Sequence, residues 1–432
     1  MLKHLKLKNI GPASSMELEF GSRLNILTGD NGLGKSFLLD IAWWSLTRKW
    51  PAEINPKLTG GKKAIPSIDE TEAKIAFAFS GKIKPEDYES NFLKKDQAWT
   101  GRAGRPANPG LVLYAMSDGS FAVWDPARNY WRTQDGVDVQ DRTPAYVFSP
   151  TEVWDGLPGP GNSWLCNGLI RDWAGWQKEK KLPFKQLKDV LKSLSPSEME
   201  LLTPGDFKRV SLDDVRDIPT IRMPYGQDVA IVHASSGMRR IMALAYFLVW
   251  AWEEHKQAAK QIGENEAHQI VFLIDEIESH LHPSWQRTIV PALLGVMEKL
   301  AKNAEVQLIT ATHSPLIMAS VEPLFDAVKD AWFDLDFVPS SKNGQAVVLS
   351  RRIYTRQGEA SSWLTSDAFD LRSSRSIEAE RVLDEASFAM TDPNFRKPEA
   401  LVVDRKLRSV LGDTDPFWMR WRFVAEKKGW LE

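Results

Sequence analysis

The chain has 432 residues, of which 43% are hydrophobic and 26% charged, and its formal net charge is −2. This composition is typical of a globular protein and excludes a disordered or fibrous one. Neither an apolar run of membrane-spanning length nor an apolar leader at residues 1–10 occurs, so we expect a cytoplasmic protein without a membrane partner. The single cysteine, Cys166, excludes an internal disulfide and a cysteine-based zinc cluster.

The N-terminal part of the chain is expected to be rich in strands. Alternating apolar residues predict strands at 2–8, 15–20, 23–28, 72–79, 111–116, 121–124 and 145–148. Residues 51–71 and 80–110 are rich in glycine, proline, lysine and aspartate, which predicts loops. A helix is expected directly after the third strand, from residue 37.

The middle of the chain changes character twice. Residues 149–232 are punctuated by prolines and predict helices, among them 164–179 and 184–194. From residue 233, a strand–helix–strand rhythm typical of an α/β sheet follows. Its predicted elements are helix 237–255, strand 270–274, helix 283–303, strand 306–310 and strand 347–350.

We therefore expect four parts. They are an N-terminal lobe at 1–148, a helical insert at 149–232, a second lobe at 233–350 and a mostly helical C-terminal region at 351–432 with helices at 377–389 and 418–428. Eighteen tryptophans are present, and three of them, Trp164, Trp173 and Trp176, fall on the predicted helix 164–179. Core packing is the ordinary interpretation of such residues, and a surface that stacks on bases or on a partner is the alternative.

A glycine-rich segment between the third strand and the first helix carries the strongest signal. Glycines let the backbone wrap phosphates, a lysine reaches the β and γ oxygens, and a serine hydroxyl coordinates Mg²⁺. The nucleotide-binding residues predicted in this way are Gly29, Asp30, Asn31, Gly32, Leu33, Gly34, Lys35 and Ser36. The sequence thus predicts a protein that binds ATP with Mg²⁺.

Two acids end the apolar strand 270–274. Asp275 stands where it can hold the shell of the Mg²⁺ ion, and Glu276 stands where it can orient and deprotonate an attacking water. Acids that merely solvate the end of a strand are the alternative, which the nearby phosphate loop disfavours. We predict Ser36 and Asp275 as metal-binding residues and Glu276 as the general base.

Two further positions carry polar groups at the ends of elements. Ser236 and Gly237 open a long apolar helix and offer a hydroxyl and backbone N–H groups as a second anion site, although a plain serine cap is the alternative. His313 ends the strand 306–310, where a structural hydrogen-bonding role is the alternative to a catalytic one.

Taken in chain order, the motifs resemble the head of ABC-type ATPases. The glycine-rich loop corresponds to Walker A, Ser236 and Gly237 to the signature, the acid pair to Walker B, and His313 to the switch histidine. Residues 275–283 and 310–315 look like those of bacterial ATPases related to the OLD (overcoming lysogenization defect) family and to the heads of chromosome-maintenance and repair ATPases. The resemblance covers residues 1–50 and about 230–320. It implies an α/β fold with a mixed sheet, and it implies that His313 meets the γ-phosphate. It also implies that Ser236 and Gly237 contact ATP bound to a second copy, with Glu278 and Ser279 at the seam.

The sequence departs from this family in two places. Such heads carry a glutamine after a mid-chain strand to touch Mg²⁺ and water, but the segment 146–153 has none, which leaves Ser149, Thr151 and Glu152 as substitutes. Met238 follows Gly237 where a second small residue or an acid is usual. We expect ATP turnover to be slow.

The function favoured by these motifs is an ATPase that dimerises on ATP and regulates a separate effector, such as a nuclease or toxin, in anti-phage defence. OLD enzymes carry a Toprim nuclease, but residues 351–432 hold no Asp-x-Asp at a strand end, so we do not expect one. A RecF-like repair ATPase that binds DNA is the first alternative. A nucleotide-gated scaffold with little turnover is the second.

Overall fold

The computed structural model describes residues 1–66, 72–80, 85–101, 108–130, 133–134, 137–138, 142–340 and 344–431. The chain forms two compact units, Met1–Ala360 and Ser361–Glu432. The finer division into four parts stays a prediction. Within the described ranges, no helix combines the length and the apolar character needed to cross a membrane.

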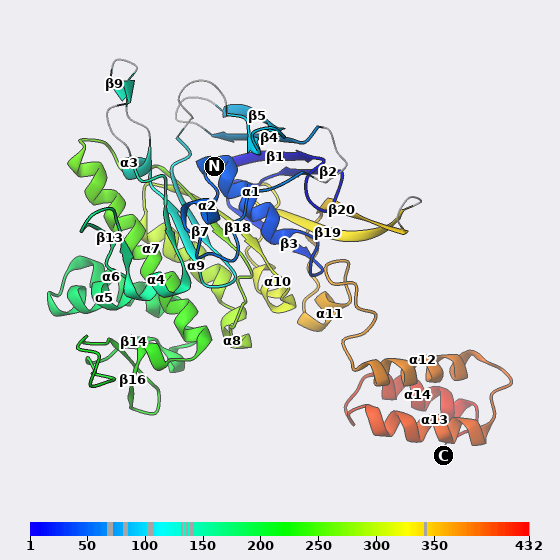
Figure 1. Ribbon diagram of the computed structural model, residues 1–432. Coiled ribbons are helices and arrows are strands. Elements are labelled where there is room, and N and C mark those ends of the chain that lie inside the picture. Colours follow the sequence, from blue (N-terminus) through cyan, green and yellow to red (C-terminus); the bar gives the residue numbers. More distant parts are fainter. Residues whose placement is uncertain are drawn as a thin grey trace. The chain divides into compact units, whose positions relative to one another are not determined.

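An eight-stranded mixed sheet forms the centre of the first unit (Figure 1). Its strands, in spatial order, are β11 (Tyr146–Phe148), β8 (Phe121–Trp124), β7 (Leu111–Ala115), β17 (Gln269–Ile274), β18 (Glu305–Ala311), β3 (Leu24–Gly29), β19 (Ala331–Ser340) and β20 (Gly344–Arg352). The five inner strands, from β7 to β19, are parallel. The carboxyl ends of parallel strands meet at one edge, so the segments after β3, β7, β17 and β18 lie close together.

A second, antiparallel sheet belongs to the same unit. Its order is β2 (Ser15–Glu19), β1 (Leu2–Lys8), β4 (Lys74–Ser80), β5 (Pro85–Leu93) and β6 (Ala98–Trp99). Strands β5 and β6 correct the prediction that 80–110 is all loop. Tyr88 of β5 stacks on Phe77 and Phe79 of β4, with ring centroids 5.1 and 5.4 Å apart. The polar residues that suggested a loop belong to strands near the sheet edge, where one face meets solvent.

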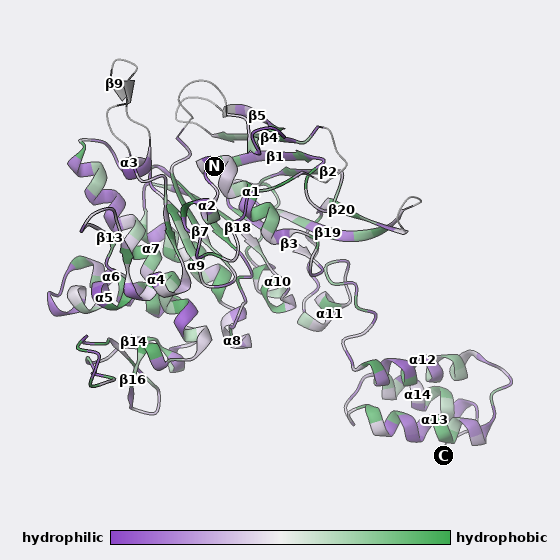
Figure 2. Ribbon diagram, viewed as in Figure 1, coloured by the Kyte–Doolittle hydropathy of each residue, from purple (hydrophilic) through white to green (hydrophobic). Residues whose placement is uncertain are grey.

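Helix α1 (Lys35–Thr47) lies between the two sheets. It contacts β1 on one side and β3, β7, β17 and β18 on the other. One hydrophobic cluster joins all three layers, including Leu5, Trp43 and Leu273, none of which is exposed. Figure 2 shows the inner strands of the large sheet coloured as hydrophobic, as expected for strands buried on both faces. The start of α1 is therefore held rigidly at the carboxyl edge.

Long and short helices cover other parts of the large sheet. In α7 (Ser236–Gln261), Phe247 stacks on Phe121 of β8 at 4.3 Å between centroids, and Trp250 packs edge-on against Phe148 of β11. The predicted helix 283–303 is in fact two helices, α8 (Pro283–Gln286) and α9 (Ile289–Leu300). Helix α10 (Pro315–Val321) follows β18.

The insert at 149–232 contains less helix than the sequence analysis predicted. Its helices are α4 (Pro150–Asp155), α5 (Leu169–Lys178) and α6 (Leu182–Ser193), with 3-10 turns at Glu198–Glu200 and Ile231–His233. Its strands are β12 (Leu157–Pro158), β13 (Trp164–Cys166), β14 (Thr203–Pro204), β15 (Thr220–Arg222) and β16 (Asp228–Ala230). The predicted helix 164–179 begins only at Leu169, because its first residues pair with β12. Trp164 is 52% exposed whereas Trp173 is fully buried, so these tryptophans do not form one surface.

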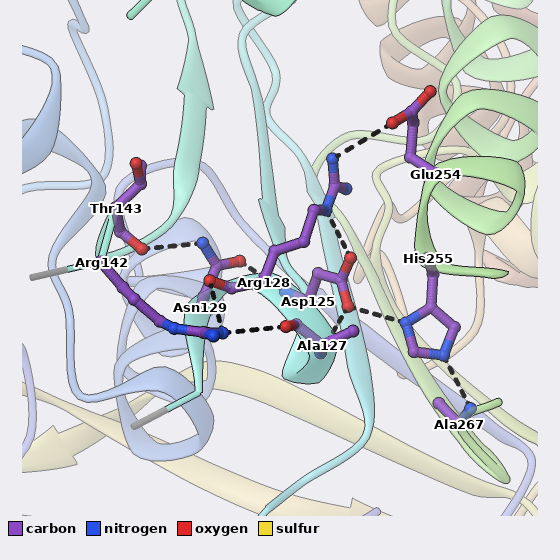
Figure 3. A network of polar contacts seen from close by, with 9 residues as sticks. All are labelled: Asp125, Ala127, Arg128, Asn129, Arg142, Thr143, Glu254, His255 and Ala267. Atoms are coloured by element: carbon purple, nitrogen blue, oxygen red, sulfur yellow. Dashed lines mark hydrogen bonds and ion pairs between the residues drawn. The ribbon is translucent and has the colours of Figure 1, made fainter. Parts of the chain in front are cut away.

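A polar network joins the end of β8 to the C-terminal half of α7 (Figure 3). Asp125 caps α3 (Pro126–Asn129), bonds to Arg128 and accepts from Nδ1 of His255, 2.7 Å away. Nε2 of His255 accepts from the backbone N–H of Ala267. Burial raises the pKa of Asp125, but His255 and Arg128 outweigh it and hold that pKa below its usual value. Every polar atom of the His255 ring is thus engaged in structure.

The remaining short elements of the first unit are α2 (Pro51–Ile54), β9 (Thr133–Gln134) and β10 (Val137–Asp138). Helix α11 (Ala360–Leu364) lies at the division between the units. The second unit contains α12 (Ile377–Thr391), α13 (Lys397–Val410) and α14 (Phe417–Lys427) around its own core. Within it, the fully buried Trp421 donates its indole N–H to Asp404 at 2.9 Å. Asp404, the acid after the apolar run 400–403, thus has a structural partner.

Candidate nucleotide-binding site

The predicted phosphate loop lies between β3 and α1 in the shape that phosphate binding needs. Gly29, Gly32 and Gly34 have φ values of 128°, 82° and 98°, which residues with a Cβ rarely adopt. A Cβ on Gly29 would also lie 2.2 Å from the carbonyl oxygen of Leu335. The loop backbone therefore requires glycine, and its N–H groups lead into the N-terminus of α1.

Lys35 is held inside this loop. Its Nζ donates to the carbonyl oxygens of Gly29 and Asp30, at 2.7 and 2.8 Å, and the residue is only 5% exposed. Burial lowers the pKa of Lys35, and the charges of Asp275 and Asp30 oppose that shift. The ammonium group is thus fixed inside the glycine loop at the start of α1.

Asp275 lies beside the start of α1. It is 3% exposed, and its backbone N–H donates to the carbonyl of Ala115 at 2.9 Å. Burial raises its pKa, and hydrogen bonding with Ser36 and Ser117 moderates that rise. Its Oδ1 is buried without a hydrogen-bond partner among the described residues. A buried carboxylate oxygen with a vacant lone pair, next to the Ser36 hydroxyl, fits a divalent cation such as Mg²⁺.

Glu276 follows on the turn after β17. Its φ is 44°, an unusual value for a residue other than glycine, and its side chain is half-buried. The next residue, Ile277, donates its N–H to the carbonyl of Ala311 at the end of β18. This bond ties the turn that carries Glu276 to the strand that leads to His313.

Arg240 holds the Glu276 turn in place and was missed by the sequence interpretation. Its Nη2 donates to the carbonyls of Asp275 and Glu276 at 2.8 and 3.2 Å. Its Nη1 donates to the carbonyls of Met116 and Ser117 at 3.1 and 3.2 Å. The signal available in the sequence was an arginine three residues after Gly237, on the apolar stripe of the α7 helix.

His313 lies near the phosphate loop. Burial lowers its pKa, and the charge of Lys35 lowers it further. The carboxylate of Glu278 accepts from the His313 backbone N–H and from the Thr312 hydroxyl, the latter at 2.7 Å. Glu278, expected at a subunit seam, thus bonds within the chain and positions the histidine.

Ser236 and Gly237 begin helix α7, as the sequence predicted, but the residue that caps the helix is Ser235. The Ser235 side chain accepts from the Met238 N–H at 3.3 Å. Ser236 is exposed, whereas Gly237 is buried, and a Cβ on Gly237 would lie 2.6 Å from the carbonyl oxygen of His280. Gly237 therefore packs closely on the turn that follows the acid pair.

The three substitutes considered for the missing glutamine lie elsewhere. Ser149 and Glu152 bond to each other in a capping box on α4, and Glu152 also accepts from Asn55 and Lys57, at 2.6 and 2.7 Å. Ser149, Thr151 and Glu152 follow β11. In the sheet, β8 and β7 lie between β11 and β17, the strand that leads to the acid pair. Ser117 follows β7, the direct neighbour of β17.

The sheet order, the glycine loop and the acid pair together define an ABC-type P-loop ATPase head. The profile of the family described as "AAA domain, putative AbiEii toxin, Type IV TA system" matches residues 24–319. The chain belongs to this family.

Several curated relatives are similar in sequence. The Septu protein PtuA of Bacillus thuringiensis is 24% identical over 73% of this chain and 72% of PtuA. The Retron Vc95 probable ATPase of Vibrio cholerae is 49% identical over 27% of this chain, and the Retron Ec83 probable ATPase of Escherichia coli is 28% identical over 37% of it. The aligned parts span only 21% and 26% of those two retron ATPases.

Solved structures also align with the chain. The SMC head domain from Thermotoga maritima covers 82% of this chain and 99% of its own, with 15% identity and a TM-score of 0.38. The recombination mediator RecF covers 82% of this chain and 98% of its own, with 14% identity and a TM-score of 0.37. The assignment of the fold therefore depends on the strand order and the loop geometry described above.

Proposed function

We propose that this protein binds ATP with Mg²⁺ and hydrolyses it to ADP and phosphate. The observation that carries the proposal is the meeting of Lys35, Ser36 and Asp275 at one edge of the sheet, with an unpartnered buried oxygen on Asp275. The names of the two retron relatives, both called probable ATPases, support it.

Each residue has a chemical role in this proposal. The loop N–H groups and Lys35 bind the phosphates, while Ser36 and Asp275 hold Mg²⁺, which when bound neutralises charge on the β and γ oxygens. Glu276 orients a water for attack on the γ-phosphorus and accepts its proton. His313 donates a hydrogen bond from an imidazole N–H to an oxygen of the γ-phosphate.

We further propose that two copies close around ATP. Support comes from Ser236, whose exposed position at the N-terminus of a 26-residue helix suits an anion presented by another molecule. ATP bound at one phosphate loop would meet this helix end on the second copy. Hydrolysis would then remove the shared charge and open the pair.

We also propose that the ATP cycle regulates a separate effector, such as a nuclease or toxin, in anti-phage defence. Support comes from the family description, which names a toxin of a type IV TA system, and from the Septu and retron relatives. Copurification of the chain with the products of neighbouring genes tests this proposal. Recovery of no second protein, with ATP or without it, would contradict it.

Phosphate release from ATP tests the catalytic assignment. Glu276→Gln should lower kcat by at least about 100-fold and leave ATP binding intact, because only the base is lost. Glu298→Gln makes the same change on the exposed face of α9 and serves as the matched control. Equal rates for Glu276→Gln and the wild type would contradict the role of Glu276.

Light scattering on Glu276→Gln tests dimer closure. This variant should double in mass when ATP and Mg²⁺ are added, because it binds ATP without consuming it. Adding Ser236→Arg, which puts a bulky cation at the exposed helix end, should abolish the change. A mass that is independent of ATP at every protein concentration would overturn the dimer.

A further inference from the structure

Three side chains that can bind a metal ion lie together on the small antiparallel sheet. Where β1 pairs with β2, His4 is directly opposite Glu19, and Lys6 is opposite Glu17. Side chains alternate between the two faces of a strand, so all four of these point to the same face. The apolar residues between them on β2 point to the other face and are buried. The pair of strands therefore gathers an imidazole and two carboxylates on its solvent side.

The three donor atoms already have the spacing of metal ligands. Nε2 of His4 lies 3.2 Å from Oε1 of Glu17 and 3.5 Å from Oε1 of Glu19. All three atoms lie within 4.8 Å of one another. In a tetrahedral zinc site with nitrogen and oxygen ligands, neighbouring ligand atoms are about 3.4 Å apart. A zinc ion would therefore enter with only small movements of these side chains.

The charges around the imidazole favour a cation. Nζ of Lys6 bonds to Oε2 of Glu17 at 2.7 Å, which leaves Oε1 of the same carboxylate facing His4. Two carboxylates against one ammonium group leave an excess of negative charge. Because ionised carboxylates only accept hydrogen bonds, Nε2 carries the proton of its bond to Glu17, and a bound metal ion would release that proton to solvent.

We propose that His4, Glu17 and Glu19 bind a Zn²⁺ ion, with water in the fourth position. An imidazole ligand favours zinc or a similar transition-metal ion over Mg²⁺ and Ca²⁺, which take oxygen ligands. The side chains of Glu17 and Glu19 are 48% and 62% exposed, so the fourth position is open to solvent. The ion would join the edge strand β2 to β1. This site shares no residue with the proposed ATP site and does not depend on it.

A coloured zinc chelator that competes with the protein tests this proposal. The full chain is first freed of metal with EDTA and is then titrated with Zn²⁺ in the absence of nucleotide. His4→Ala should weaken zinc binding by at least about 10-fold, because removal of even an outer partner of a metal ligand has an effect of that size. Glu17→Gln and Glu19→Gln should each weaken it as well. Co²⁺ in place of zinc should give the visible absorption of a tetrahedral ion, which His4→Ala should lose.

Matched controls make the result specific. Glu89→Gln removes a carboxylate from β5 of the same sheet, where it pairs with Lys74, and it should bind zinc like the wild type. His268→Ala removes an exposed histidine just before β17 and should do the same. In EDTA, His4→Ala should unfold at nearly the same temperature as the wild type, because exposed ion pairs contribute little. Zn²⁺ should raise the unfolding temperature of the wild type only.

Two outcomes would overturn the proposal. One is a metal-free wild type that takes up no Zn²⁺ from the chelator. The other is zinc that binds equally well to the wild type and to His4→Ala but is lost in His282→Ala, which would place the ion on the exposed pair His280 and His282. Either outcome would leave the proposed ATP site standing, because none of these residues belongs to it.

Discussion

Lys35 shows how a charge can be buried before its ligand arrives. Its ammonium group satisfies two loop carbonyls, at 2.7 and 2.8 Å, in a residue that is 5% exposed. In the proposed function, an arriving phosphate would meet a cation whose side chain is already ordered by these bonds.

Replacing this cation should cost most of the affinity for ATP. Lys35→Ala should weaken ATP binding by at least about 10-fold, since a hydrogen bond to a charged group contributes about 1.5–3 kcal/mol. Isothermal titration measures the effect. Lys49→Ala, an exposed lysine just past the same helix, is the control and should bind like the wild type.

Asp40 lies on α1, one turn beyond Ser36. Because of its shifted pKa, we expect the free energy of unfolding of the protein to depend on pH. Burial raises its pKa to about 7, a hydrogen bond from Tyr114 at 2.9 Å opposes the shift, and the charge of Asp275 adds to it. A pKa that is higher in the folded state than in the unfolded one favours folding at low pH. That stabilisation is lost as pH rises from the unfolded value near 4 through 7.

Asp40→Asn should remove this loss. In EDTA, urea unfolding should give a larger free energy of unfolding for the variant than for the wild type at pH 8. At pH 5, this difference in the free energy of unfolding should be smaller by about 2 kcal/mol. Asparagine can still accept from Tyr114, so the packing is preserved. A difference that does not change between pH 5 and pH 8 would contradict the assignment.

At the scale of elements, the N-terminus of α7 is joined to the turn after the acid pair. Arg240 bonds to the carbonyls of Asp275 and Glu276, and Gly237 lies against His280 with no room for a Cβ. A displacement of this helix end would thus move the Glu276 turn. The proposed dimer contact at Ser236 would in this way act on the catalytic turn of its own chain.

Gly237→Ala tests this coupling. The new Cβ would lie 2.6 Å from the His280 carbonyl oxygen, so the helix end and the turn must separate. Thermal unfolding should show a loss of about 1–3 kcal/mol, as overpacked sites do, together with a lower kcat. Gly295→Ala in α9, where a Cβ meets nothing within 4 Å, should instead be neutral or stabilising.

At the scale of the whole molecule, the two compact units have separate cores. The C-terminal unit buries its own cluster, which includes Trp418, Trp421 and Leu407. Every candidate site residue lies in the first unit. Folding of the C-terminal unit should therefore be independent of nucleotide.

Calorimetry of the full chain tests this independence. Trp421→Ala should destabilise one transition by about 3–5 kcal/mol, as truncating a buried aromatic residue does. The transition that shifts upward with ATP and Mg²⁺ should be unaffected. A single transition that responds both to Trp421→Ala and to ATP would show that the units unfold together.

Local signals were enough to predict much of this protein. The glycine loop at 29–36, the acid pair after 270–274 and the helix predicted from 237 are read from neighbouring residues, because a buried strand, a glycine turn and a helix start are short-range patterns. The family profile over residues 24–319 agrees with the ATPase class inferred from these motifs. The mixed sheet was also predicted, whereas β5, β6 and the break in helix 283–303 were not.

Only the tertiary structure decided which polar groups surround the site. Arg240 reaches four carbonyls because α7 begins at that edge, and Glu278 turns inward onto Thr312 because β18 is the next strand. None of these contacts is encoded in local spacing, since each depends on strand order and helix packing. The sequence determines which residues are candidates for the chemistry, and the order of the sheet decides which of them meet.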